Sequence, residues 1–353
     1  MYKKLSIEEK ICQKLVLGCN SSNVDIIVSM IEKYSIGGVI LYKKNYKNYK
    51  EMVNVINRLK NANKNNKIPL FISIDQEGGR VNRMPLEFKN IKNIYDISYK
   101  DSDLVYKSGL ITGEMLSSLG INMNFSPVLD VYNNSSKLLY KRCFYGDLEK
   151  VNNSSIKYIN GLKEKGIISV VKHFPGHGIS KIDSHFIIPY VFNNKLIKDH
   201  VKPFENAINY GVDSLMVGHL IIKGMTRGLS ASISSLFINK FIREKYNYNG
   251  LIVTDEIGML SRNKIFRFSV LKKAILSGGD LILMKIDKEE DSLVNKLVSF
   301  VKRDKNNIDI INDSVKRIIS IKEKYMINDN LIDNKCDIDK INKEIEEINR
   351  ICE

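Results

Sequence analysis

The stretch GLIVTD, residues 250–255, combines two features that recur along this chain of 353 residues. It begins with a glycine and an uninterrupted apolar run. Such a run is typical of a strand that is buried on both faces of a parallel sheet. Thr254, Asp255 and Glu256 follow the apolar run, so polar side chains stand directly at the end of the predicted strand.

Seven further runs are rich in leucine or β-branched residues, and each is followed by a segment of helical length. They are KLVLG (14–18), GGVILY (37–42), PLFISID (69–75), NMNFSP (122–127), ISVVKH (168–173), DSLMVGH (213–219) and DLILM (280–284). Eight parallel strands that alternate with helices predict an α/β protein with a single-domain (β/α)8 barrel. An open doubly wound sheet is disfavoured, because no glycine-rich phosphate loop follows the first run.

Helix-capping residues, amphipathic patterns and charged segments predict the helices between and after the strands. Between the strands, residues 102–120 predict a helix with Ser102 as N-cap and Gly120 beyond its end. Two amphipathic helices are expected after the eighth strand. We therefore predict a catalytic barrel over residues 1–326 and a charged tail helix over 327–353 that belongs to the same domain.

The composition excludes several function classes. The net charge is +15, but the lysines are dispersed without an arginine-rich stripe or interleaved aromatic residues, so no nucleic-acid partner is expected. No apolar run reaches the roughly 18 residues of a membrane span. The start, MYKKLSIEEK, lacks the apolar core of a signal peptide, and the five cysteines are scattered without a C-x-x-C pair. We expect a cytoplasmic protein with reduced thiols.

Polar residues gather at the ends of four predicted strands. These residues are Asp75, the pair Lys172 and His173, His219, and Asp255. The active site of a (β/α)8 barrel lies at the carboxyl ends of its strands. A single aspartate there is more often a helix cap, whereas four such ends together favour a catalytic site.

The histidine spacing invites a metal-site interpretation. His173 and His177 are four residues apart, as in H-E-x-x-H helices. Pro175 and Gly176 lie between them, however, and prevent a helix from placing both imidazoles on one face.

A metal-dependent hydrolase is the sharper alternative, because His173, His219 and Asp255 could supply ligands from three strand ends. The first strand adds no histidine, and the cationic Lys172 would stand beside the metal. We therefore predict neither a metal nor another cofactor. This alternative implies activity that chelators abolish and zinc restores.

Sugar chemistry fits the carboxylates better. A retaining glycosidase needs a carboxylate nucleophile and an acid/base, and Asp255 suits the first role. Glu256 is a poor choice for the second group, because adjacent residues of an extended strand point to opposite sides and Glu256 would point away from Asp255. Asp183 and His185, in the sequence DSH, are close enough for the carboxylate to orient the imidazole as an acid. By spacing alone, the favoured interpretation of that pair is two exposed loop residues without a catalytic role.

Taken together, the motifs resemble glycoside hydrolase family 3, and specifically its single-domain bacterial β-N-acetylglucosaminidases. The resemblance rests on IGGVILYKKN (36–45), IDQEGGRVNRM (74–84), GINMNFSPVLDV (120–131), KHFPGHGISKIDSH (172–185) and GLIVTDEIGM (250–259). It implies that Asp255 is the nucleophile and that Asp183 and His185 form a mobile acid/base dyad. It also implies that five residues bind the sugar hydroxyls: Asp75, Arg83, Arg142, Lys172 and His173.

The resemblance further implies a retaining exo-β-N-acetylglucosaminidase whose partner is a small carbohydrate released from peptidoglycan. Larger members add a second domain that supplies the acid/base, so the DSH loop is the expected source here. A phosphorylase of the same family and a catalytically inert sugar-binding sensor remain as alternatives. The chain departs from the family pattern at Ile179 and Ser180, at Tyr145 beside the expected pocket, and at Glu256.

Overall fold

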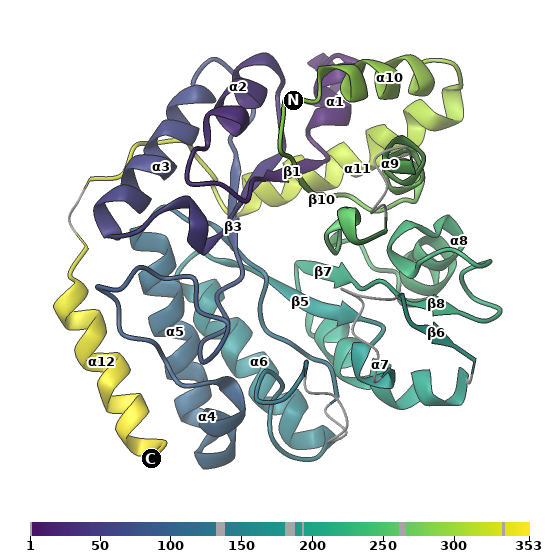
Figure 1. The fold of residues 1–353 in the computed structure, drawn as a ribbon. Helices are drawn as coiled ribbons and strands as arrows, with labels where there is room; N and C mark the ends of the chain where they lie inside the picture. Colours follow the sequence, from purple (N-terminus) through teal and green to yellow (C-terminus); the bar gives the residue numbers. More distant parts are fainter. Residues whose placement is uncertain (1, 132–137, 181–187, 193, 261–265, 334–335) are drawn as a thin grey trace.

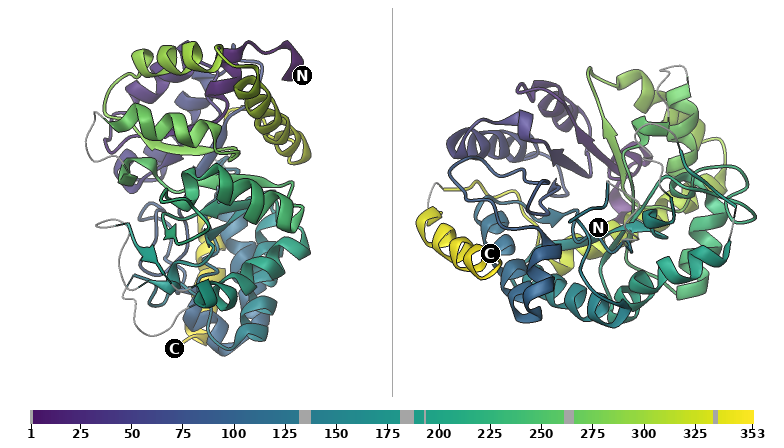
Figure 2. Two further views of the ribbon diagram at one scale, coloured as in Figure 1. Left: turned by 90° about the vertical axis from the view of Figure 1, so that its right-hand side faces the viewer. Right: turned by 60° about the horizontal axis from the view of Figure 1, so that its bottom comes forward.

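The computed structural model describes residues 2–131, 138–180, 188–192, 194–260, 266–333 and 336–353 (Figure 1). Asp183 and His185 lie outside the described residues. The chain alternates strands with helices, and Figure 2 shows the helices on the outside with the strands within.

The eight predicted strands are all present and all parallel. They are β1 (Leu15–Gly18), β2 (Gly38–Leu41), β3 (Phe71–Ile74), β4 (Met123–Asn124), β5 (Ile168–Phe174), β7 (Ser214–Val217), β9 (Leu251–Thr254) and β10 (Ile282–Lys285). They form one sheet in the order β10-β1-β2-β3-β4-β5-β7-β9. A parallel bridge between Val253 and Leu281 links the two ends of this order. The (β/α)8 prediction is therefore confirmed.

Helices follow each strand of the barrel. They are α2 (Asp25–Lys33), α3 (Tyr49–Ala62), α4 (Ile94–Lys100), α5 (Ser102–Ser118), α6 (Leu148–Glu164), α7 (Asn194–Tyr210), α8 (Ser235–Ile238), α9 (Arg267–Leu276), α10 (Asp291–Val301) and α11 (Lys305–Lys324). A short helix α1 (Ile7–Cys12) precedes β1. As expected, two helices follow the eighth strand. No helix in the described part of the chain is both long enough and apolar enough to cross a membrane.

Two details differ from the sequence prediction. The N-cap of α5 is Asp101 rather than Ser102, because the Asp101 carboxylate accepts the Asp103 backbone N–H. A small parallel sheet of β6 (Tyr190–Val191) and β8 (Ile221–Ile222) was not predicted. Two-residue strands leave no periodic pattern in the sequence, which explains why it was missed.

The tail helix α12 (Ile338–Ile351) lies along α5 (Figure 1). Its buried isoleucines, Ile341, Ile345 and Ile348, join the main hydrophobic core. Its polar face holds the loop that precedes α4, since the side chains of Asn342 and Asn349 accept the backbone N–H groups of Lys89 and Lys92.

The core has two layers, and strand side chains alternate between them. In β9, Leu251 and Val253 point into the barrel, whereas Ile252 packs outward against the helices. Likewise, Val16 of β1 faces the barrel interior while Leu15 and Leu17 face outward. Because side chains alternate with a period of two, the same alternation determines which residues just beyond each strand point their side chains into the barrel mouth.

Candidate active site

The alternation of the strands carries four charged side chains into the barrel mouth. Leu251 and Val253 face inward, and Asp255 follows with the same parity. Lys172 likewise follows Ile168 and Val170, while Lys285 follows Leu281 and Leu283. Asp75 follows Phe71 of β3 by four residues and therefore points to the same side, into the barrel. Because parallel strands end on the same side of a barrel, these four side chains converge.

Together they line a cavity of about 300 Å³, which we call the barrel-mouth cavity. All six sugar-site residues from the sequence that the structure describes lie on its wall. They are Asp75, Arg83, Arg142, Lys172, His173 and Asp255. The wall also contains Tyr42, Glu77, His177, Glu256 and Lys285.

Asp255 is held as a carboxylate. Burial opposes its charge, but His219, His173, the Glu256 backbone N–H and Lys172 outweigh it and lower the pKa to about 2. The Glu256 N–H donates to Asp255 Oδ1 at 2.8 Å. An ionised oxygen fixed at a strand end has the charge and the rigidity that a nucleophile requires.

A network of buried ion pairs fixes the positions of two cations in the cavity, Arg142 and Lys172. Both oxygens of Glu77 accept from Arg142, from Nε and Nη2 at 2.8 Å each. Lys172 Nζ lies 2.7 Å from Glu77 and 2.7 Å from Asp75. Burial raises the pKa of Glu77, but Lys172 and Arg142 outweigh it and hold that pKa well below its usual range. Neither cation can swing away without leaving a buried charge unpaired.

A second buried carboxylate, Asp130, orients the histidines. Asp130 Oδ2 lies 2.7 Å from His173 Nδ1, and its other oxygen accepts the backbone N–H of His177 at 2.5 Å. Burial opposes the charge of Asp130, yet His173 and His177 lower its pKa. The contact fixes the ring of His173 and leaves its Nε2 for a ligand in the cavity.

His219 is the strand-end residue that the sequence placed wrongly. It follows Met216 by three residues, so its parity is outward, and it is absent from the wall of the cavity. Its two ring nitrogens contact Ser232 Oγ at 2.7 Å and the Glu256 carbonyl at 2.9 Å. It therefore supports the turn after β9 from outside the cavity, next to the residue whose backbone N–H binds Asp255.

These contacts bear on the metal-site alternatives. His173 Nδ1 is committed to Asp130, and both nitrogens of His219 have protein partners. Over the described ranges of the chain, no group of three or more His, Cys, Asp or Glu side chains could hold a metal ion. The described histidines thus do not support the set of His173, His219 and Asp255.

Glu256 and Tyr145, two departures from the family pattern, have clear local roles. The strand β9 ends at Thr254, and the Oε1 atom of Glu256 accepts the backbone N–H of Gly258 at 2.8 Å. Tyr145 lies outside the cavity wall. Its ring packs edge-on against Tyr95 and Tyr99 at centroid distances of 5.2 and 4.8 Å. Tyr145 therefore does not narrow the cavity around Asp255, whereas Glu256 lies on its wall.

Glu77 and Asp130 are the site residues that sequence reasoning missed. Both stand inside motifs that were recognised, Glu77 in IDQEGGRVNRM and Asp130 in GINMNFSPVLDV. A carboxylate that lies in a buried segment needs a cation as partner. The presence of Glu77 and Asp130 in these motifs was therefore the sign that each pairs with a buried cationic side chain.

Comparison with known proteins now assigns the family. Residues 6–321 match the family described as the glycosyl hydrolase family 3 N terminal domain. The chain belongs to glycosyl hydrolase family 3. This family 3 assignment confirms both the resemblance drawn from the motifs and the enzyme class, a glycosidase.

Individual relatives agree with the assignment. The chain is 29% identical over 325 residues to beta-hexosaminidase A of Pseudoalteromonas piscicida, a match that covers 84% of this chain and 54% of that protein. It thus spans about half the length of that relative. It is also 29% identical over 275 residues to the beta-hexosaminidase of Methylobacillus flagellatus, covering 74% of this chain and 77% of the other.

A solved family 3 structure has the same fold. The β-N-acetylglucosaminidase of Paenibacillus sp. str. FPU-7 superposes with a TM-score of 0.88 at 26% identity. The superposition covers 99% of this chain and 69% of that one. The family 3 barrel is therefore shared over essentially the whole chain.

Proposed function

We propose that the protein is a retaining exo-β-N-acetylglucosaminidase that removes terminal N-acetylglucosamine from peptidoglycan fragments in the cytoplasm. The observation that carries the proposal is the ionised Asp255 at one wall of a cavity whose other walls present Lys172, Arg142, His173 and Asp75. The names of the two hexosaminidases and of the Paenibacillus enzyme supply the choice of sugar.

The cavity chemistry supports a terminal sugar as ligand. Asp75 accepts from adjacent hydroxyl groups, while Lys172, Arg142 and His173 donate to others. Charge-assisted hydrogen bonds of this kind are strong, and each is lost when a hydroxyl is missing or inverted. A closed set of such donors and acceptors suits the non-reducing end of a chain, so we infer exo action.

In the first step, an oxygen of Asp255 attacks the anomeric carbon. The bond from that carbon to the leaving oxygen breaks, and His185, protonated and oriented by Asp183, gives its proton to that oxygen. The product is a covalent glycosyl-aspartate. The two residues of the dyad take these roles from the family resemblance.

In the second step, water attacks the same carbon. His185, now neutral, accepts a proton from the water, and Asp255 leaves as a carboxylate. The configuration at the anomeric carbon is retained because it is inverted twice. A neutral imidazole, unlike a carboxylate, does not repel an anionic incoming nucleophile.

The deciding experiment compares wild type with Asp255→Asn and His185→Ala on aryl β-N-acetylglucosaminides. Asp255→Asn should lose nearly all turnover, and near-normal activity would contradict the nucleophile assignment. His185→Ala should lose much activity with poor leaving groups and little with activated ones, which need no proton. An equal loss with both kinds would argue against an acid role.

Added phosphate separates hydrolysis from phosphorolysis in the same assay. We expect N-acetylglucosamine as the product, and turnover that does not depend on phosphate. Formation of the sugar 1-phosphate, with turnover that rises with phosphate, would identify a phosphorylase. Binding of N-acetylglucosamine by wild type without any release of aglycone would identify a sensor.

A further inference from the structure

Four tyrosines gather on the outer surface of the barrel, where α4 meets the loop after β4. We call them the tyrosine patch; they are Tyr95, Tyr99, Tyr140 and Tyr145. None of the four lines the barrel-mouth cavity. The patch includes Tyr145, at which the chain departs from the family pattern.

The rings of the patch have fixed positions. Tyr95 and Tyr99 are four residues apart on α4, so both lie on the same face of the helix. The ring of Tyr145 stands nearly perpendicular to both, at interplanar angles of 82° and 78°. Its backbone N–H donates to Ser98 Oγ at 2.8 Å. Tyr145 thus joins the loop after β4 to α4.

An ion pair completes this link and leaves two rings open to solvent. Lys141 follows Tyr140 in the loop, and its ammonium binds Asp96 of α4 at 3.1 Å. Tyr99 is nevertheless 55% exposed and Tyr140 49% exposed. Single exposed aromatic residues are common on protein surfaces, whereas a group of them held in place marks a binding surface.

The patch lies at the mouth end of the barrel. Helix α4 follows β3, and the loop of Tyr140 follows β4, so both stand at the carboxyl ends of strands. Leu138 and Arg142, on either side of Tyr140 in the sequence, line the barrel-mouth cavity. One loop therefore carries the proposed sugar site on its inner side and the tyrosine patch on its outer side.

The charges around the patch favour an uncharged ligand. Within two residues of the four tyrosines, the chain has three carboxylates and three cations, namely Asp96, Asp101, Asp147, Lys100, Lys141 and Arg142. This balance gives no excess charge that would attract a nucleic acid or an anionic membrane surface. A tyrosine combines an apolar ring face with a hydroxyl group. A sugar ring matches it, with apolar C–H groups and hydroxyls of its own.

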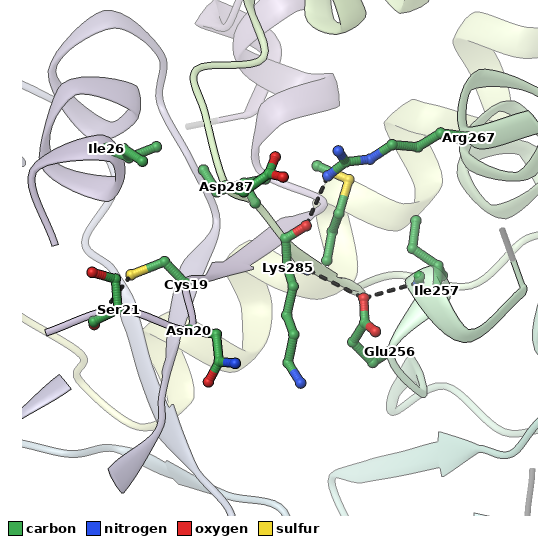
Figure 3. Close-up of a pocket in the computed structure, with 12 residues that line it drawn as sticks. Cys19, Asn20, Ser21, Ile26, Glu256, Ile257, Arg267, Lys285 and Asp287 are labelled. Carbon is green, nitrogen blue, oxygen red and sulfur yellow. Dashed lines mark hydrogen bonds between the residues drawn. The ribbon is translucent and has the colours of Figure 1, made fainter. Parts of the chain in front are cut away.

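The opposite side of the mouth has a different character. In the order of the eight-stranded barrel, β4 and β10 are four strands apart. Beside β10 lies a cavity of about 510 Å³, and none of the described side chains that line it is aromatic (Figure 3). Its guanidinium, Arg267, already binds the Lys285 carbonyl and Glu290, both at 2.7 Å. This cavity therefore offers polar groups without a ring on which a sugar could stack.

From these observations we propose that the tyrosine patch is a second carbohydrate-binding site, which holds an uncharged stretch of glycan outside the barrel-mouth cavity. The choice of N-acetylglucosamine as its sugar rests on the proposed function. The exposed rings of Tyr99 and Tyr140 stack on sugar rings, while Tyr95 and Tyr145 hold them in position. Glycan held there has its chain ends at a raised local concentration beside the barrel mouth.

The test measures depletion of the protein from solution by chitin, an insoluble polymer of N-acetylglucosamine. Chitin is uncharged, so the net charge of +15 does not cause binding. Saturating free N-acetylglucosamine occupies the barrel-mouth cavity, so that retention on chitin reports on the patch. The variants are Tyr99→Ala and the double variant Tyr99→Ala/Tyr140→Ala. Tyr210→Ala is the matched control, because Tyr210 is 44% exposed but ends α7, at the opposite end of the barrel.

We expect wild type and Tyr210→Ala to bind chitin equally. Tyr99→Ala should weaken the affinity roughly fivefold, and the double variant should weaken it at least about tenfold. Thermal unfolding midpoints should stay equal. Turnover of a small aryl β-N-acetylglucosaminide should stay within about twofold of wild type, since neither exchanged ring lines the cavity.

Three results would overturn the proposal. The first is chitin binding that is absent in wild type or unchanged in the double variant. The second is a parallel loss of aryl turnover, which would show that the patch only supports Arg142. The third is dissociation of a dimer at unchanged chitin affinity, which would identify a contact between two copies of the chain. If the tyrosines carry chitin binding but wild type hydrolyses no glycoside, the proposed function fails while the carbohydrate site stands.

Discussion

Glu77 offers the sharpest test of the buried ion network. Its carboxylate binds Arg142 through two hydrogen bonds of 2.8 Å and Lys172 through a contact of 2.7 Å. The side chains are almost closed to solvent, with exposed fractions of 5% for Glu77, 13% for Arg142 and 3% for Lys172. Glu77→Gln keeps the shape and removes the charge, so two cations are left with only Asp75.

The expected destabilisation follows from that burial. Removing one partner of a buried ion pair costs about 3–5 kcal/mol, because the remaining charge is uncompensated. We expect a loss of this size in the free energy of unfolding, measured by urea denaturation with circular dichroism at neutral pH. The lowered pKa of Glu77 means that its stabilisation is present above the unfolded pKa of about 4.3 and is lost as pH falls below it. The variant should lack this part of the acid sensitivity.

A matched control separates burial from charge. Glu114 on α5 also contacts two lysines, Lys165 and Lys340, both at 3.0 Å, but its side chain is 29% exposed. Glu114→Gln should cost less than about 1 kcal/mol. If Glu77→Gln costs no more than this control, the network does not carry the energy assigned to it.

Activity gives a second measure of the same substitution. Arg142 would lose the acceptor that sets its position, and a hydrogen bond to a charged group contributes about 1.5–3 kcal/mol. We expect kcat/KM for an aryl β-N-acetylglucosaminide to fall by roughly tenfold to a hundredfold at pH 7. Unchanged kcat/KM in a folded Glu77→Gln protein would show that Arg142 and Lys172 do not need this anchor.

Three other buried charges give measurable outcomes. Asp130→Asn should lower kcat/KM roughly tenfold to a hundredfold, because the His173 ring loses its charged acceptor; wild-type kinetics would contradict this. With the pKa of Asp255 at about 2, kcat/KM should show no acidic limb above about pH 4 while the protein stays folded, and a limb near pH 5 would contradict it. Burial lowers the pKa of Lys14 to about 7, so between about pH 7 and 10 the unfolded state binds more protons and stability should rise with pH. Burial lowers the pKa of Lys322 to about 7 as well, so urea titrations of Lys14→Met should show a smaller rise rather than none, and an unchanged slope would refute the contribution of Lys14.

Much of the fold was readable because each barrel strand is a short apolar run. GLIVTD and DLILM correspond to β9 and β10 within two residues. The strand ends also located Asp75, Lys172, His173 and Asp255 correctly at one mouth. His219 was placed wrongly, since a list of strand ends ignores the inward or outward parity of each residue.

Other parts of the site depend on contacts between distant segments, which no local pattern encodes. Glu77 is 65 residues from Arg142, and Asp130 is 43 residues from His173. Arg83 and Arg142 came only from the family resemblance, because neither stands at a strand end. The roles of Asp183 and His185 remain predictions from that resemblance.

The charge balance of the barrel-mouth cavity argues for a neutral ligand that becomes positive during the reaction. Arg142 and Lys172 are matched by Glu77 and Asp75, and the other two cations of the wall, Arg83 and Lys285, are balanced by Asp255 and Glu256. The remaining donors can therefore bind hydroxyls without an excess of positive charge that would attract an anion. Asp255 remains as a carboxylate on the opposite wall. In glycoside hydrolysis, positive charge develops on the sugar ring in the transition state. A carboxylate already fixed beside that ring favours the transition state over the neutral ground state, which is the condition for catalysis rather than for binding alone.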